Sequence, residues 1–240
     1  MRVSIVVPAH NEEENLERVV SGLISELADA KFEKEVVLVD DCSTDGTGVV
    51  AERLAKMNDE TRLVRRTGTP GFGKALRKGF EAASGDYVVP FMADGSDSPQ
   101  DLVRLVSIAN GQGYDIVAGT RWSSGSRVVD YPPLKMVFSR AFSVVCRLLT
   151  GIRLHDFSNA FRAYNRRALL ALRLNSDSFE ISAEILIKAY FTGFSIAEVP
   201  VDWRGRIRGS SKLKLAKIGP RFVRLLMEQL FSRPANMRAI

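Results

Sequence analysis

Short segments rich in Val and Ile alternate with segments of helical pattern, and this alternation constrains the fold most. Arg2–Pro8 and Glu35–Val39 read as buried strands, because aliphatic and mainly β-branched residues dominate both. Between them the apolar side chains recur at the three- and four-residue spacing of a helix: Leu16, Val19, Val20, Leu23, Ile24 and Leu27. This order predicts a largely parallel sheet covered by helices, a three-layer α/β fold.

The alternation continues to the end of the chain. We expect helices at about 48–56, from the loop at Gly71 through Ala83, and at 99–110, 134–149, 182–192 and 220–231. Strands are expected near 62–65, 87–92, 115–119 and 195–202. Residues 121–133 read as a loop and residues 155–165 as irregular. A chain of 240 residues is long enough for one large domain with a well-buried core.

Cysteine content and hydropathy bear on the compartment. Two cysteines, Cys42 and Cys146, make neither a disulfide framework nor a metal-finger spacing, which favours a reducing compartment. The opening M-R-V-S-I-V-V-P reads as a strand rather than a signal peptide, and no apolar run reaches the roughly 18 residues of a membrane span. We therefore expect a cytoplasmic protein.

Positive charge is concentrated at the C-terminal end. Residues 204–240 hold ten Lys and Arg against one glutamate, Glu228, although the whole chain carries only +6. A basic tail on a mildly acidic body indicates binding to an anionic surface or substrate. On charge alone, nucleic acid and anionic lipid both qualify. No aromatic interleaving or nucleic-acid-binding motif accompanies the tail, so we expect no nucleic acid partner.

The stretch Gly85–Pro99 reads as a strand that ends abruptly in an acidic turn, M-A-D-G-S-D-S-P. Strand ends in open α/β sheets are where ligands bind. Asp94 and Asp97 are hard oxygen donors three residues apart, and such a pair suits Mg²⁺ or Mn²⁺. Taken alone, the same letters also describe an ordinary solvated surface turn.

Two further polar turns follow expected strands: A-H-N-E at Ala9–Glu12 and D-D-C-S-T-D-G-T from Asp40. In a parallel sheet all three turns lie at one edge, where their side chains can grip a ribose, a base and a metal-bound diphosphate. A glycine-rich loop with Lys74 offers further N–H groups or a lysine to phosphate. It is not a P-loop, because Ala75 follows Lys74.

Together these motifs resemble the family 2 glycosyltransferases of the GT-A fold, most closely those that transfer a sugar to dolichyl or polyprenyl phosphate. V-P-A-H-N-E-E-E-N-L is similar to the family's V-P-x-Y-N-E-x-x-N-L, and V-D-D-C-S-T-D-G-T to V-D-D-G-S-x-D-G-T. Further similar motifs are G-x-x-x-A-x-G-D at Gly79–Asp86, G-T-R-W, D-F-S-N-A-F-R-A-Y, A-E-V-P-V and R-I-R-G-S-S-K-L. They follow the family order along almost the whole chain.

The resemblance implies transfer of a sugar, mannose or glucose, from GDP-mannose or a UDP-sugar to the lipid phosphate, with inversion. The implied donor-binding residues are Pro8, Ala9, His10, Glu12, Asp40, Asp41, Lys74 and Ala93. Asp94 is the implied ligand of the divalent metal, and Asp97 a second contact. Arg121, Arg206 and Lys212 are expected to meet phosphates, and Asp156, Arg162 and Glu184 to line the sugar and acceptor side.

Three departures from the family pattern concern these residues. Met92 stands where the family has the first aspartate of its acidic motif, and Asp97 stands where His or Gln is frequent. Both bear on metal preference and metal dependence. His10 replaces the usual tyrosine, which keeps a ring for stacking and adds a titratable group.

A lipid phosphate is already anionic, so we expect Asp156 to position groups rather than to act as a base. The alternative for Asp156 is a structural salt bridge with Arg162. We expect a catalytic domain at 1–205 and a membrane-docking tail at 206–240, with helices 134–149 and 220–231 lying in the interface. The protein would then sit peripherally on the cytoplasmic face of the membrane or use a membrane-anchoring partner subunit. The alternatives are a transferase for a soluble or glycan acceptor and a non-catalytic nucleotide-sugar-binding subunit.

Overall fold

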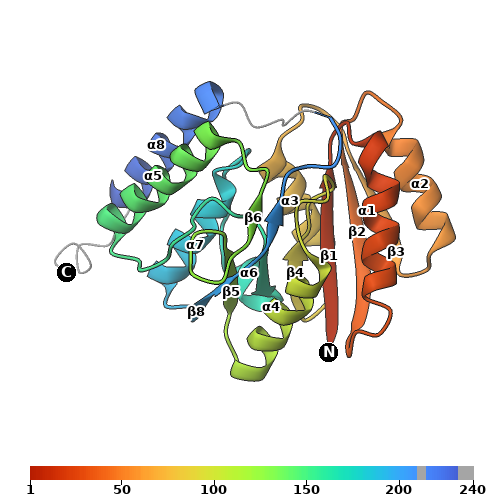
Figure 1. The fold of residues 1–240 in the computed structure, drawn as a ribbon, viewed down its shortest axis with the longest axis horizontal. Coiled ribbons are helices and arrows are strands. Elements are labelled where there is room, and N and C mark those ends of the chain that lie inside the picture. The colour runs from red at the N-terminus through yellow and green to blue at the C-terminus, as the bar shows by residue number, and fades with distance from the viewer. Residues whose placement is uncertain (210–214, 232–240) are drawn as a thin grey trace.

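The computed structural model describes residues 1–209 and 215–231, and within them a seven-stranded sheet forms the centre of the molecule (Figure 1). Its strands lie in the order β3-β2-β1-β4-β7-β5-β8. Their bounds are β1 Arg2–Ala9, β2 Glu33–Asp41, β3 Thr61–Arg66, β4 Tyr87–Pro90, β5 Ile116–Thr120, β7 Arg162–Asn165 and β8 Ile196–Pro200. A two-stranded sheet pairs β6, Val128–Val129, with β9, Trp203–Arg204.

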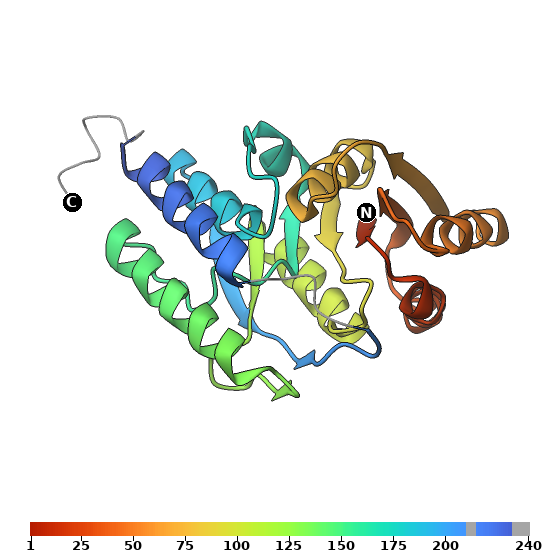
Figure 2. The same ribbon diagram turned by 90° about the horizontal axis from the view of Figure 1, so that it is seen from above.

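Helices cover both faces of the sheet, as the three-layer prediction requires. They are α1 Glu13–Glu26, α2 Thr47–Met57, α3 Phe72–Ala82, α4 Pro99–Gln112, α5 Pro133–Thr150, α6 Arg166–Ala171, α7 Ile181–Thr192 and α8 Leu215–Phe231. One core contains buried side chains of α1, α2 and α4, and the other those of α3, α5, α6, α7 and α8. Seen from above, α5, α7 and α8 lie together at one end of the sheet and α1 and α2 at the other (Figure 2).

Alternation along the strands divides the residues between the two cores. On β2, Val36 and Leu38 face one core, and Val37 and Val39 face the other. All four are fully buried, as expected of a central parallel strand covered on both faces. The predicted α/β class and its largely parallel sheet are therefore confirmed.

Several short elements were not predicted. Val128–Val129 forms β6 within residues 121–133, which were expected to be a loop, and Arg166–Ala171 forms α6, where no helix was expected. Residues 155–165 were expected to be irregular, but Arg162–Asn165 forms β7, which runs antiparallel between β4 and β5. Ala163 faces one core and Tyr164 the other. Four residues are too few to show an alternating pattern, so the strand is fixed by its neighbours. The predicted strand at 87–92 is also shorter, because β4 ends at Pro90.

The C-terminal helix is part of the domain core. It begins at Leu215, and Phe222, Leu225 and Leu226 are buried among residues of α5 and α7. The rings of Phe222 and Phe142 lie 4.2 Å apart between centroids. The expected division at residue 205 therefore does not coincide with a break in packing. No helix in the described part of the chain is long and apolar enough to cross a membrane.

Candidate active site

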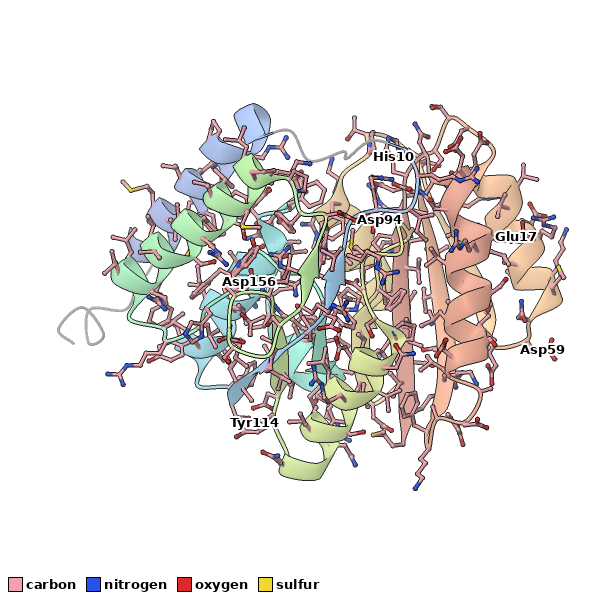
Figure 3. All side chains as sticks on the ribbon, viewed as in Figure 1. His10, Glu17, Asp59, Asp94, Tyr114 and Asp156 are labelled. Atoms are coloured by element: carbon pink, nitrogen blue, oxygen red, sulfur yellow. The ribbon has the colours of Figure 1, made fainter. Side chains whose placement is uncertain are left out.

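The polar turns after β1, β2 and β4 meet at the carboxyl edge of the sheet. Ala9 pairs with Asp40 in the parallel register of β1 and β2. The side chain of Asn11 accepts a hydrogen bond from the Thr44 N–H at 2.8 Å, and the Glu12 N–H donates to Thr47 Oγ1 at 2.8 Å. Figure 3 shows His10 and Asp94 at this same edge. The convergence expected from three separate motifs is therefore present.

A cavity of about 360 Å³ opens between this edge and the α5–α8 pair. We call it the cleft. Its polar lining comes from Glu12, Asp94, Ser96, Asp97, Arg121, Asp130, Lys135, Ser139, Ser158, Asn159, Ser182 and Arg206. Its aromatic lining comes from Phe72, Tyr131, Phe138, Phe179, Trp203 and Phe222. The cleft thus joins a charged end to an aromatic wall.

The two aspartates of the acidic turn differ in environment. The Asp97 side chain is buried, and its Oδ2 accepts the Met92 N–H at 2.9 Å. Burial raises the pKa of Asp97 to about 7, against the opposing effect of the Met92 N–H, and the nearby Asp94 charge adds to the rise. Asp94 is more open, accepts the Ser96 N–H at 3.1 Å, and lies 4.0 Å from Arg206 Nη1.

Asp94 and Asp97 could supply part of the ligand set of a divalent ion. Both line the cleft and supply hard oxygen ligands, the type that Mg²⁺ and Mn²⁺ prefer. Within residues 1–209 and 215–231, no group of three His, Cys, Asp or Glu side chains is placed to hold a metal. The donor set therefore suits an ion completed by water and substrate phosphates rather than an all-protein cage.

Residues 203–208 lie across the acidic turn and bring Arg206 into the cleft. The Arg204 N–H donates to the Ser96 carbonyl at 3.1 Å, and the Ile207 N–H to the Asp94 carbonyl at 3.1 Å. Arg206 Nη2 donates to both carboxylate oxygens of Glu12, at 2.8 and 2.7 Å. Glu12, expected to contact the donor, thus holds an arginine. Lys212, also expected at a phosphate, lies outside the described residues.

Lys135 is a cleft residue that the sequence did not single out. It lies in the first turn of α5, beside Pro132 of the preceding loop. Burial lowers the pKa of its ammonium group, and the nearby Arg206 lowers it further. No salt bridge of Lys135 occurs among the described residues. Its sequence signal is a lysine at the beginning of a largely apolar helix that also carries Arg140 and Arg147, and snorkelling explains such a lysine equally well.

Arg121 and Asp156 form a buried, bidentate ion pair. Arg121 Nε donates to Asp156 Oδ2 at 2.7 Å, and Nη2 to Oδ1 at 3.0 Å. Burial would raise the pKa of Asp156, but the charge and hydrogen bonds of Arg121 outweigh it and lower the pKa. Asp156 is therefore an ionised partner of Arg121, which agrees with positioning better than with base catalysis. The salt bridge considered for Asp156 has Arg121, not Arg162, as its partner.

Arg162 and Glu184 are not among the residues that line the cleft, and their expected place on the acceptor side stays a prediction. Arg162 is fully buried and donates to the backbone carbonyls of Ser182 and Phe157. Glu184 accepts the N–H groups of Asn175 and Ser176, each at 2.9 Å. Both side chains support the loops around the cleft.

The glycine-rich loop also differs from expectation. The Gly73 N–H donates to the Asp177 carbonyl at 3.0 Å, and Lys74 Nζ donates to Thr69 Oγ1 at 2.8 Å and lies 3.6 Å from Asp177 Oδ2. These donors are thus engaged within the protein rather than turned to the cleft. The sequence did not indicate that the loop of residues 175–178, far along the chain, supplies the partners of Gly73 and Lys74.

The expected donor residues at β1 and β2 are at the edge of the sheet. His10 Nδ1 lies 2.8 Å from the Asp41 carbonyl oxygen, and Asp40 Oδ1 accepts the Ser43 N–H at 3.2 Å. The Asp41 carboxylate pairs with Arg66 and accepts the Gly71 N–H at 2.7 Å, so it braces the loop before α3. Pro8 and Ala9 at the end of β1 and Ala93 after β4 are buried.

The chain is similar to one protein family and to several known proteins. The family model described as "Glycosyl transferase family 2" matches residues 4–173. The chain is 31% identical to a polyprenol monophosphomannose synthase of Mycolicibacterium smegmatis, with 90% of this chain and 83% of that protein covered. It is also 31% identical to an undecaprenyl-phosphate mannosyltransferase of Micrococcus luteus, with 100% and 98% covered.

Two further likenesses extend the comparison. A dolichol-phosphate mannosyltransferase of Pyrococcus furiosus is 35% identical, with 89% of this chain and 60% of that protein covered. Among solved structures, glucosyl-3-phosphoglycerate synthase from Mycobacterium tuberculosis with UDP superposes with a TM-score of 0.72 at 23% identity, covering 97% of this chain and 81% of that one. The same synthase is also known with Mn²⁺ and UDP-glucose, at a TM-score of 0.71 and 22% identity. At such identity the likeness concerns the fold.

Proposed function

Because the chain belongs to glycosyl transferase family 2, we propose that it transfers mannose from a nucleotide-diphosphate sugar to the phosphate of a polyprenyl lipid. It is an enzyme with the GT-A fold of that family. One observation carries the choice of acceptor: the cleft combines cations with an aromatic wall. A polyprenyl phosphate is complementary to both parts, because its phosphate is anionic and its isoprenoid chain is apolar.

The charged end suits two phosphate groups. Lys135 and Arg206 both line the cleft and lie near Asp94. We assign Arg206 to the donor diphosphate, because residues 203–208 cross the acidic turn, and Lys135 to the acceptor phosphate, because it lies on α5 beside Phe138. Two fixed cations would align the anionic nucleophile with the anomeric carbon and stabilise the leaving diphosphate.

The site needs no strong base. A phosphate oxygen is anionic near neutral pH and carries no proton that must be removed before attack. Asp156 is correspondingly occupied by Arg121 and has a lowered pKa. Arg121, held in this way, keeps the cleft wall between Tyr131 and Ser158 in place.

Asp94 and Asp97 would hold a divalent ion, Mg²⁺ or Mn²⁺. When bound, such an ion neutralises the charge that develops on the leaving diphosphate. With Met92 at the start of the motif, these two carboxylates are its protein ligands in the proposal. His10 and Asp40 would contact the nucleoside, and GDP-mannose is the first donor to test.

The outer face of α5 and α8 supports docking to a bilayer. Leu148 is 80% exposed, Leu134 72% and Val223 63%. Val137, Val144, Val145 and Met227 extend this apolar face. Arg140, Arg147, Arg221 and Arg224 supply positive charge on the same two helices. Apolar stripes with basic flanks bind the headgroup region of anionic membranes. The protein would thus act peripherally; the cytoplasmic face and an anchoring subunit stay predictions.

The test is transfer of labelled sugar from GDP-mannose or UDP-glucose to a short polyprenyl phosphate, with Mn²⁺, Mg²⁺ or EDTA. We expect a lipid-linked mannose that requires metal and is lost in Asp94→Asn. The matched control is Asp59→Asn, an exposed aspartate far from the cleft (Figure 3), which should retain activity.

Two outcomes would contradict the proposal. Transfer to a water-soluble phosphorylated or glycan acceptor, with none to lipid, would establish the soluble-acceptor alternative. Donor binding without transfer to any acceptor would indicate a nucleotide-sugar-binding subunit.

A further inference from the structure

The A-E-V-P-V motif is not used by the reaction proposed above. Its glutamate, Glu198, lies on β8 opposite Ala118 of β5 and outside the cleft lining. Its carboxylate accepts the His155 N–H, at 2.7 and 3.0 Å to its two oxygens, and the Asp156 N–H at 3.0 Å. His155 Nδ1 lies 2.6 Å from Glu198 Oε2. One carboxylate therefore fixes two successive residues of a turn.

Asp156 transmits this restraint to the cleft. Its Oδ1 accepts the N–H groups of Ser158 and Asn159, each at 3.1 Å, and both of its oxygens bind Arg121. The Arg121 guanidinium carbon lies 5.1 Å from the Trp122 ring centroid and 5.4 Å from that of Tyr131. A continuous path thus runs from β8 through the turn to the cleft wall.

We infer that Glu198 is a positioning residue for sugar transfer, acting through Asp156 on Arg121. This inference rests on the proposed function for its activity readout. An ionised carboxylate makes stronger hydrogen bonds to backbone N–H groups than a neutral amide, and a bidentate arginine pair tolerates little displacement of its partner. Loss of the Glu198 charge would therefore loosen Asp156 and misplace the guanidinium at the cleft.

The first experiment compares Glu198→Gln with wild type in transfer to polyprenyl phosphate. A displacement of about 1 Å in a site costs on the order of 100-fold in rate, so we expect kcat to fall about 10- to 100-fold. The donor Kd should stay within about twofold, because His10 follows β1 and Asp40 lies at the carboxyl end of β2, both away from the turn that Glu198 holds. His155→Ala keeps both backbone N–H donors and should cost less than Glu198→Gln.

Glu35→Gln is the matched control. Glu35 is a buried glutamate that accepts the Ser84 N–H at 2.6 Å, but it lies at the amino edge of the sheet. Its substitution should lower Tm and leave kcat unchanged. Glu198→Gln should lower kcat at temperatures well below its own Tm, which separates positioning from general stability.

A second readout needs no substrate. The chain has two tryptophans, Trp122 and Trp203, and both contact the Tyr131 ring beside Arg121. We expect Glu198→Gln to change tryptophan emission and acrylamide quenching, and Glu35→Gln to leave them as in wild type. Added to Asp156→Asn, Glu198→Gln should cause no further change in emission or kcat.

Two results would overturn the inference. One is a kcat in Glu198→Gln within about twofold of wild type with unchanged emission. The other is independent, multiplicative effects of Glu198→Gln and Asp156→Asn. A wild-type protein that transfers no sugar to any polyprenyl phosphate would defeat the proposed function instead, and the emission measurements would still decide whether Glu198 holds Arg121.

Discussion

Two buried carboxylates, one at each edge of the central sheet, differ in their balance of burial and hydrogen bonding. At the amino edge, Glu35 accepts hydrogen bonds from Ser4 Oγ, the Ser84 N–H and Ser84 Oγ, and lies 3.4 Å from Arg62. Burial would raise the pKa of Glu35, but these hydrogen bonds and the Arg62 charge lower it. At the carboxyl edge, burial and Asp94 raise the pKa of Asp97 to about 7.

The difference lies in how completely each charge is satisfied. The amino edge supplies enough donors to make an ionised side chain favourable, so Glu35 stabilises the fold. At the carboxyl edge, Asp97 accepts the Met92 N–H but is buried next to an open cleft, which disfavours its ionised form and destabilises the fold as pH rises. In the proposed function, Asp94 and Asp97 have to stay available to bind a metal ion. Substitutions at the two edges should therefore separate activity from stability.

The largest expected effect is on activity at the carboxyl edge. Asp94→Asn should lower kcat/KM by about 100- to 1,000-fold, as loss of one electrostatic contact to a transition state does. Its free energy of unfolding should not fall. Steady-state transfer assays and urea unfolding of the same preparation measure both quantities. Equal activity in Asp94→Asn and wild type would remove Asp94 from the site.

Glu35→Gln should give the reverse pattern. We expect its free energy of unfolding to fall by about 1–3 kcal/mol at pH 7, because buried polar groups lose a charged partner. The lowered pKa means that Glu35 contributes stability above pH 4.5 and loses it as pH falls through the folded-state pKa. The variant should therefore approach wild type in acid. A loss of stability that persists unchanged at pH 3 would show that charge is not the cause.

A cation of the cleft gives a smaller effect. Lys135→Met should raise the KM for the lipid phosphate about 10-fold, the effect of losing one hydrogen bond to a charged group. Lys135→Arg keeps the charge and should restore most of the affinity. Titration of acceptor at saturating donor distinguishes the two variants. A rise in donor KM alone would place Lys135 at the diphosphate instead.

The remaining prediction is a gain in stability. With its folded-state pKa near 7 and an unfolded value near 3.8, Asp97 binds more protons in the folded state between those pH values, so stability falls as pH rises through them. Asp97→Asn removes that cost. In EDTA it should be about 4 kcal/mol more stable than wild type at pH 8, the linkage energy of a rise of about three pKa units, and close to wild type at pH 4. Parallel stability curves from pH 4 to pH 8 would refute the raised pKa.

The carboxyl edge was predictable because each polar turn is local in sequence. A strand followed by A-H-N-E or M-A-D-G-S-D places its side chains at the sheet edge whatever the rest of the chain does. The longer helices were found for the same reason, since their periodicity spans three or more turns, but α6, with six residues, was not. The pairings across the fold were not predictable. Arg121 with Asp156, Arg206 with Glu12 and Lys74 with Asp177 depend on which loops meet, and β7 depends on the two strands that it joins.

The salt bridge between Glu12 and Arg206 joins residues 194 positions apart. During synthesis on the ribosome, the opening motif therefore emerges long before the arginine that completes its site. Until that arginine arrives, Glu12 and Asp94 face each other across the cleft without the guanidinium that lies between them. The cleft is consequently complete only when residues from both ends of the chain are in place, because Arg206 and, on α8, Phe222 line it together with Glu12.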